Sequence, residues 1–245
     1  MTDAADAPTT LTPPAAVLFD MDGTLFDSEK VWDIALRELA QAYGGELTEA
    51  ARTAMVGGSL HSSMVTLHAD IGQPWRDIAT SGAWLEQRVG ELFLTELEWR
   101  PGAQALLMAT KRAGVPTALV TNTGRALVEL ALDVIGREWF DAVVCGDEVT
   151  AGKPHPEPYL MAARLLGVPI GACVAIEDSP VGIASAHTAG ATVLAIPHDV
   201  AIDPPAGVHV RATLTGADVT LLASLSAPVL PAPAPPAPAL PAPGR

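Results

Sequence analysis

Basic residues are scarce in this 245-residue chain, which has 14 lysines and arginines against 28 acidic residues and a formal charge of −14. Only three of the bases are lysines, namely Lys30, Lys111 and Lys153. A charge of this sign repels a nucleic-acid backbone and an anionic membrane surface, so we expect neither as a partner. Any anion-binding site in such a chain has to gather its positive charge locally.

Cysteine, aromatic residues and long apolar runs are also sparse. The two cysteines, Cys145 and Cys173, lie in or beside short apolar stretches, which favours small core residues over a disulfide. The N-terminus lacks a basic segment, and the first apolar run, AAVLF, is too short for a signal peptide or a membrane span. These absences favour a cytoplasmic protein. Aromatics at 4% within a hydrophobic fraction of 49% are typical of an α/β chain with a sizeable core.

The two ends of the chain are expected to be disordered. Residues 1–14 are polar and contain proline. Residues 226–245 form a Pro/Ala tract, which favours extended polyproline-like conformations and cannot build a core. We interpret this tail as a spacer.

Between these ends, short apolar runs alternate with amphipathic stretches. Five runs are predicted to be strands: residues 16–19, 117–120, 142–145, 173–176 and 193–196. Four stretches between them have helical spacing: residues 103–113, 125–135, 158–166 and 181–189. This alternation predicts an α/β fold, a Rossmann-like parallel sheet with right-handed crossovers and helices on both faces.

The gap between the first two strands is about 90 residues, far more than one crossover helix needs. It contains four stretches with helical spacing, separated by glycines: residues 32–43, 49–55, 59–68 and 82–95. We therefore predict an all-helical cap over residues 29–98, inserted into a core formed by residues 15–28 and 99–225. Gly57-Gly58 is expected to place backbone amides over the site. The cap is expected to open and close about residues 27–29 and 100–102.

Polar side chains follow the predicted strands where each strand ends. They are Asp20 and Asp22 after the first strand, Thr121 and Asn122 after the second, Lys153 in the loop after the third, and Glu177 and Asp178 after the fourth. In an open α/β sheet, ligands bind beyond the carboxyl ends of the strands. We therefore expect these side chains to form one site.

The carboxylates in this set favour a divalent metal. Asp20 and Asp22 are only two residues apart, and two such charges repel each other unless a cation lies between them. Asp178 would complete an oxygen-rich site, with Glu177 as a ligand directly or through water. Oxygen ligands of this kind suit Mg²⁺.

The same residues can perform phosphoryl transfer. With a metal neutralising the repulsion between two anions, Asp20 can attack phosphorus in line and form an acyl phosphate. Asp22 can protonate the leaving oxygen and then deprotonate the water that cleaves the intermediate. Thr121, Asn122 and Lys153 would hold the phosphoryl oxygens.

Each of these residues also has an ordinary structural explanation when it is taken alone. An aspartate after a strand favours a turn, and Thr121-Asn122 fits a helix N-cap. Asp178 precedes Pro180 at a good helix start, so capping is a serious alternative for it. Lys153 fits a solvated loop. The occurrence of all of them at successive strand ends favours a catalytic site.

Four stretches of the chain resemble the motifs of a known family, the haloacid dehalogenase superfamily. Within it, the chain resembles the phosphoglycolate phosphatase and β-phosphoglucomutase-like group, which has a helical cap after the first strand. VLFDMDGTLFDSE resembles the first motif, LVTNT the second, AGKPHPEPY the third and IEDSPVGIASAHTAGATVLAI the fourth. The similarity extends over residues 16–216.

The resemblance implies a role for each matching residue. Asp20 would be the nucleophile and Asp22 the acid/base, while Thr121 and Lys153 contact phosphate. Asp20, the Asp22 carbonyl and Asp178 would bind Mg²⁺. The implied activity is Mg²⁺-dependent hydrolysis of a small phosphorylated metabolite through a phosphoaspartyl intermediate on Asp20.

A sugar phosphomutase is the closest rival within this family. Such mutases resemble this chain in all four motifs, but their cap carries a Lys and an Arg around a Gly-x-Ser stretch to grip a second phosphate. The corresponding residues here, 56–61, include neither Lys nor Arg, and Trp32 stands where the mutases carry a His. We interpret Trp32 as packing in the cap or its hinge. These differences favour a phosphatase.

A dehalogenase, a phosphonate-cleaving enzyme and a catalytically silent module are less well supported. Asp22 argues against the dehalogenases, which lack the second Asp of the pair, and Lys30 is the sole cap lysine for the Schiff base of phosphonate cleavage. A silent regulatory or binding module would be favoured by loss of the acidic residues or of Lys153, all of which are present. Glycolate phosphate, a sugar phosphate and a nucleotide are all compatible with the sequence, and oligomeric state leaves no sequence signal.

Overall fold

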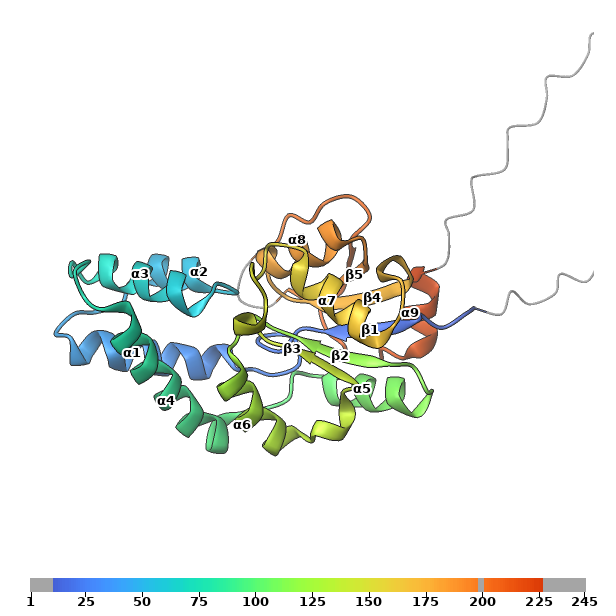
Figure 1. Ribbon diagram of the computed structural model, residues 1–245, viewed down its shortest axis with the longest axis horizontal. Helices are drawn as coiled ribbons and strands as arrows, with labels where there is room; N and C mark the ends of the chain where they lie inside the picture. Colours follow the sequence, from blue (N-terminus) through green and yellow to red (C-terminus); the bar gives the residue numbers. More distant parts are fainter. Residues whose placement is uncertain (1–10, 198–200, 227–245) are drawn as a thin grey trace, which may run out of the picture.

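A parallel sheet forms the centre of the molecule (Figure 1). The computed structural model describes residues 11–197 and 201–226. Within them, six strands pair in the order β3-β2-β1-β4-β5-β6, all parallel. They are β1 (Ala16–Phe19), β2 (Thr117–Val120), β3 (Ala142–Val144), β4 (Cys173–Glu177), β5 (Thr192–Ala195) and β6 (His209–Val210).

Helices cover the two faces of the sheet (Figure 1). One face carries α5 (Ala103–Arg112), α6 (Arg125–Ile135) and α9 (Val219–Ser226), and the other carries α7 (Glu157–Leu166) and α8 (Pro180–Ala189). Side chains of a strand alternate between the faces, so Val17 and Phe19 join one core cluster while Ala16 and Leu18 join the other. Short 3₁₀ turns at Arg137–Trp139, Gly146–Glu148 and Ile170–Ala172 complete the connections.

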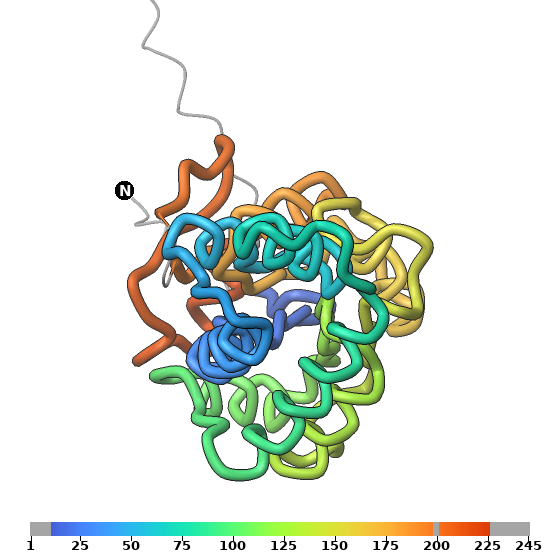
Figure 2. Tube along the Cα trace, turned by 90° about the vertical axis from the view of Figure 1, so that its left-hand side faces the viewer, coloured from blue at the N-terminus to red at the C-terminus, as the bar shows by residue number. Residues whose placement is uncertain are grey.

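Four helices inserted between β1 and β2 form a cap beyond the carboxyl ends of the strands (Figures 1 and 2). They are α1 (Glu29–Ala42), α2 (Glu49–Met55), α3 (Leu60–Asp70) and α4 (Ile78–Glu96). Figure 2 views the molecule from the cap side, with α1 almost end-on. Thr48, Ser59 and Asp77 cap the later three helices by accepting a backbone N–H of the first turn.

The two connections between cap and core run side by side. The Asp27 N–H donates to the Glu98 carbonyl and the Arg100 N–H to the Leu25 carbonyl, both at 2.8 Å. The rings of Phe26 and Trp99 pack with their centroids 4.3 Å apart. The cap is therefore attached to the core through two short segments that are hydrogen-bonded to each other, an arrangement that suits a hinge.

The parallel α/β sheet and the inserted helical cap confirm the fold expected from the sequence. Each of the five expected strands is present within one residue of its expected bounds. Both cysteines are buried and free, as expected. Among the described residues, no helix is long and apolar enough to cross a membrane.

Some details differ from the expectation. The third strand ends at Val144, so Cys145 lies outside it, and the sequence patterns missed β6 and α9. A two-residue strand leaves no alternation to detect. The helix α9 includes Ser226, the first residue of the expected tail. Disorder expected at residues 1–10 and 227–245 falls outside the described residues, and the exact domain boundaries stay predictions.

A buried histidine fixes part of the cap interior. His68 on α3 is 1% exposed, and its Nε2 lies 2.8 Å from the Ser81 Oγ on α4, which in turn lies 2.8 Å from the Tyr43 hydroxyl. Its Nδ1 is buried without a hydrogen-bond partner among the described residues. Burial, followed by repulsion from Arg76, lowers the pKa of His68.

We predict that His68 makes the stability of the protein fall in mild acid. Because its folded-state pKa lies below the unfolded value of about 6.5, the unfolded chain binds the proton first and stability is lost as pH drops below that value. Urea unfolding from pH 7 to pH 5 should show a shallower loss for His68→Gln than for the wild type, by at most about 1.4 kcal/mol per pH unit. His61→Gln, at an exposed position of the same helix, should keep the wild-type slope. Equal slopes for His68→Gln and the wild type would contradict the prediction.

Candidate active site

The ammonium of Lys153 lies at the centre of a buried ionic cluster at the carboxyl edge of the sheet. Its Nζ donates to the Asp20 Oδ1 and the Glu177 Oε1, both at 2.6 Å, and to the Val120 carbonyl at 2.9 Å. The Tyr159 hydroxyl from α7 donates to the same Glu177 oxygen at 2.5 Å. These contacts join the ends of β1, β2 and β4 to the loop that precedes α7.

Three carboxylates meet beside this ammonium. Asp20, Glu177 and Asp178 each offer an oxygen within 4.8 Å of the others, and all three are buried. The Oδ2 of Asp20 is buried without a hydrogen-bond partner among the described residues. Burial, followed by repulsion from Glu177, raises the pKa of Asp20 to about 8, and burial with repulsion from Asp20 raises that of Asp178 well above its usual range.

This cluster fits a hard divalent cation. One lysine cannot balance three buried carboxylates, and the partnerless Asp20 oxygen is an available ligand. Gly23 adopts a φ of +80°, and a Cβ there would overlap the Asp178 carboxylate. Glycine at position 23 therefore allows Asp178, the residue that follows β4, to lie close to the loop after β1.

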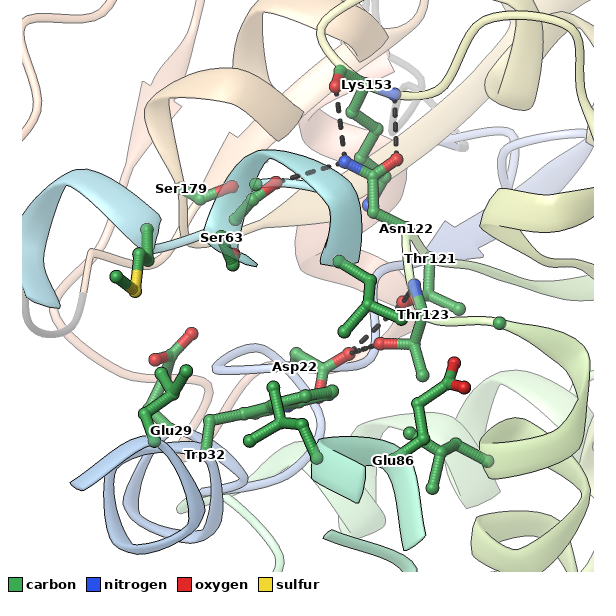
Figure 3. A pocket seen from close by; sticks show the side chains of 18 of the residues that line it. Asp22, Glu29, Trp32, Ser63, Glu86, Thr121, Asn122, Thr123, Lys153 and Ser179 are labelled. Atoms are coloured by element: carbon green, nitrogen blue, oxygen red, sulfur yellow. Dashed lines mark hydrogen bonds between the residues drawn. The ribbon is translucent and has the colours of Figure 1, made fainter. Parts of the chain in front are cut away.

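Asp22 is not among the three carboxylates of this cluster, and its side chain lies between Trp32 of the cap and Thr123 of the core (Figure 3). Its Oδ1 accepts from the Ser28 Oγ at 2.7 Å and the Trp32 Nε1 at 3.0 Å. Its Oδ2 accepts from the Thr123 Oγ1 at 2.7 Å and the Thr121 Oγ1 at 3.2 Å. Four donors from both cap and core thus fix the position of this carboxylate.

Asn122 connects the core to the cap (Figure 3). Its Nδ2 donates to the Gly57 carbonyl at 3.0 Å and to the Lys153 carbonyl at 3.2 Å, while its Oδ1 accepts from the Lys153 N–H at 2.8 Å. Both amide hydrogens are therefore used, and a phosphate contact by Asn122 stays a prediction. The glycine pair does lie over the site, but through the Gly57 carbonyl, and the Gly58 N–H donates to Met55.

A cavity of about 80 Å³ lies between cap and core. Core residues on its wall include Asp20, Asp22 and Lys153, while the cap contributes Glu29, Trp32, Arg52, Ser63 and Glu86 (Figure 3). A space of this size holds several water-sized groups, so a larger ligand would need more room than the described structure provides.

The structure brings all seven residues expected at strand ends to one edge of the sheet. It also rules out three of the ordinary explanations considered for them, although a turn does follow Asp20 and Asp22. Ser179, rather than Asp178, caps α8, and Gly124, rather than Thr121 or Asn122, stands at the N-cap of α6. Lys153 is 7% exposed, so it is not a solvated loop lysine.

Several residues near the site were not singled out from the sequence. Thr123 lies within the LVTNT stretch, where its hydroxyl was a usable signal. Trp32 was expected to pack in the cap, yet its indole also donates to Asp22. Arg52 and Glu86 carried no local pattern, because only the folding of the cap places them on the cavity wall.

Lys30, the one cap lysine considered for a Schiff base, does not line the cavity. Its side chain is 68% exposed and pairs with Asp27.

Comparison with known proteins supplies the family. The sequence model of the haloacid dehalogenase-like hydrolases matches residues 14–190. The chain belongs to this family. The expected resemblance is therefore confirmed, and with named phosphatases among its relatives the chain is a phosphoric monoester hydrolase.

Individual relatives in the family are moderately similar. Hexitol phosphatase A of Escherichia coli is 34% identical over 182 residues, covering 73% of this chain and 81% of its own. A probable pseudouridine-5'-phosphatase of Drosophila melanogaster is 31% identical over 191 residues, covering 74% and 80%. The crystal structure of CbbY from Rhodobacter sphaeroides in complex with phosphate has a TM-score of 0.75 at 26% identity, over 85% of this chain and 99% of that one.

We predict that the indole of Trp32 assists Asp22. Trp32→Phe keeps an aromatic ring on the cavity wall but removes one of the four donors to the Asp22 carboxylate. Loss of a hydrogen bond to a charged group should lower kcat about tenfold, measured as phosphate release. Trp84→Phe, on α4 and outside the cavity wall, should leave kcat unchanged. A wild-type kcat for Trp32→Phe would show that this donor is dispensable.

Proposed function

We propose that the protein is a Mg²⁺-dependent phosphatase that hydrolyses a small phosphomonoester through a phosphoaspartyl intermediate on Asp20. The observation that carries this proposal is that Asp20 and Asp22, although only two residues apart in the sequence, have different surroundings. Asp20 lies against Lys153 with one oxygen lacking a partner, and Asp22 faces the cap among four donors. Two such environments support two chemical roles.

Asp20 is the nucleophile in this proposal. Its carboxylate oxygen forms a bond to phosphorus as the bond to the leaving oxygen breaks, and Lys153 and Thr121 hold the phosphoryl oxygens. A bound Mg²⁺, held by Asp20 and Asp178 with the Asp22 carbonyl that the family resemblance implies, would offset the repulsion between the carboxylate and the phosphate. Glu177 is already engaged by Lys153 and Tyr159, which supports an indirect role for it.

Asp22 is the acid and then the base. It protonates the leaving oxygen in the first step and takes a proton from the attacking water in the second. The second step breaks the bond between Asp20 and phosphorus, releases inorganic phosphate and restores both carboxyl groups. Ser28, Trp32 and Thr123 hold the Asp22 side chain in position for this exchange.

A phosphatase is better supported than a sugar phosphomutase. A mutase has to hold a second phosphate at the cap, whereas the one arginine on the cavity wall, Arg52, pairs with Glu29. A catalytically silent module is disfavoured, because the catalytic residues of a hydrolase family are present and come together.

Phosphate release from a panel of small phosphomonoesters tests the activity. We expect release that requires Mg²⁺ and stops with EDTA. The panel includes β-glucose 1-phosphate together with glucose 1,6-bisphosphate. Isomerisation without net phosphate release would establish a mutase and overturn the proposal.

Two substitutions test the assigned roles. Asp20→Asn should abolish turnover, because the nucleophile is lost. Asp22→Ala should lower kcat by about 10²- to 10⁴-fold while the dissociation constant for Mg²⁺, measured by calorimetry, stays near the wild-type value. A normal rate in Asp20→Asn would rule out the covalent mechanism, and lost Mg²⁺ affinity in Asp22→Ala would place that carboxylate in the metal site.

A further inference from the structure

The cavity wall carries more negative than positive charge. Its acidic residues are Asp20, Asp22, Glu29 and Glu86, and its basic residues are Arg52 and Lys153. A ligand carries other groups besides its phosphoryl group. Whether the cavity can bind a second negative charge among them depends on whether either base is available.

Both bases are already paired with carboxylates. Lys153 donates to Asp20 and Glu177 at 2.6 Å each. The buried Arg52 donates through Nη2 to the Glu29 carboxylate and, at 3.0 Å, to the Glu29 carbonyl. Its Nε also lies 3.3 Å from the Asp33 Oδ1. Releasing Lys153 or Arg52 would break a buried ion pair, which is strongly unfavourable.

Glu86 adds a further acceptor at the cap side. It lies on α4 at the edge of the cavity, near Thr123 (Figure 3). A Cβ built on Gly124 would lie 3.4 Å from the Glu86 Oε1 and 3.6 Å from the Asp147 Oδ2, so two carboxylates flank this glycine. Within residues 11–197 and 201–226, no side chain pairs with Glu86 by a hydrogen bond or an ion pair. An ionised carboxylate accepts hydrogen bonds and repels anions.

Much of the remaining cavity wall is apolar. It includes Leu36, Met55, Leu60 and Leu85 from the cap, Leu127 from the core and the ring of Trp32. Such a surface suits the carbon skeleton of a ligand, while Glu86 and the hydroxyl of Ser63 can bind its hydroxyl groups.

We propose that this cavity selects phosphomonoesters whose leaving group bears hydroxyl groups and no negative charge, and that Glu86 is the residue that excludes carboxylates and second phosphates. The inference rests on the proposed function, because it names the substrate class of the same site. Selection arises from repulsion of the wrong ligand as well as from contacts with the right one.

Two matched ligand pairs test the proposal. Glycerol 3-phosphate and 3-phosphoglycerate differ at one end, where a hydroxymethyl group replaces a carboxylate. Glucose 6-phosphate and glucose 1,6-bisphosphate differ by a second phosphate. Dissociation constants are measured by calorimetry with Mg²⁺ on the Asp20→Asn protein, so the result does not depend on turnover. We expect the member without the extra charge to bind about tenfold more tightly in each pair.

Glu86→Gln on the same background should reduce this preference to within about threefold, chiefly by tightening the binding of the charged members. Glu96→Gln makes the same charge change at an exposed position of α4 outside the cavity and should leave the preference intact. Equal affinities within the pairs, binding of none of the four ligands, or a preference that Glu86→Gln does not alter would overturn the inference. If the wild type releases no phosphate but this preference is present, the proposed function fails and the charge selection stands.

Discussion

The balance of charge around Lys153 is the constraint on which the candidate active site depends. One ammonium contacts groups at the ends of three adjacent strands, β2, β1 and β4, and all of these groups are buried. A buried carboxylate is tolerated only when it is paired, and three carboxylates share this single lysine. Burial, followed by repulsion from Glu177, raises the pKa of Asp20, and a bound divalent cation would offset both effects. The fit to a divalent cation thus follows from the same packing that places Asp20, the proposed nucleophile.

The short turn after β1 places two aspartates, Asp20 and Asp22, in different environments. Met21 is buried between them, and the Gly23 N–H donates to the Phe26 carbonyl at 2.8 Å, which folds the chain back. Asp20 consequently remains with the sheet and Lys153, while Asp22 reaches the Trp32 indole of the cap. Two aspartates this close in the sequence are compatible with two roles. The turn is what places their carboxylates in different environments.

The parts of the site that were predictable from the sequence are those that the sheet alone positions. Parallel strands end at a common edge, so polar residues after the predicted strands were bound to converge once the strands were correct. Trp32, Arg52 and Glu86 were not predictable as site residues, because their position depends on how the cap helices pack against one another and the core. The spacing of apolar residues in the sequence identifies the buried face of such a helix. It does not identify which of the polar residues lines the cavity.

Hydrogen bonds across the cavity connect the cap to the proposed catalytic residues. Trp32 of α1 donates to the candidate acid Asp22, and Gly57 of the cap accepts from Asn122, which also holds the backbone of Lys153. A cap that swings away about the Phe26 and Trp99 hinge withdraws these contacts together. The donors around Asp22 are therefore complete only while Trp32 of the cap lies in place. Because acidic residues outnumber bases on the cavity wall and both bases are paired, the selection that we propose would also discriminate between leaving groups by charge.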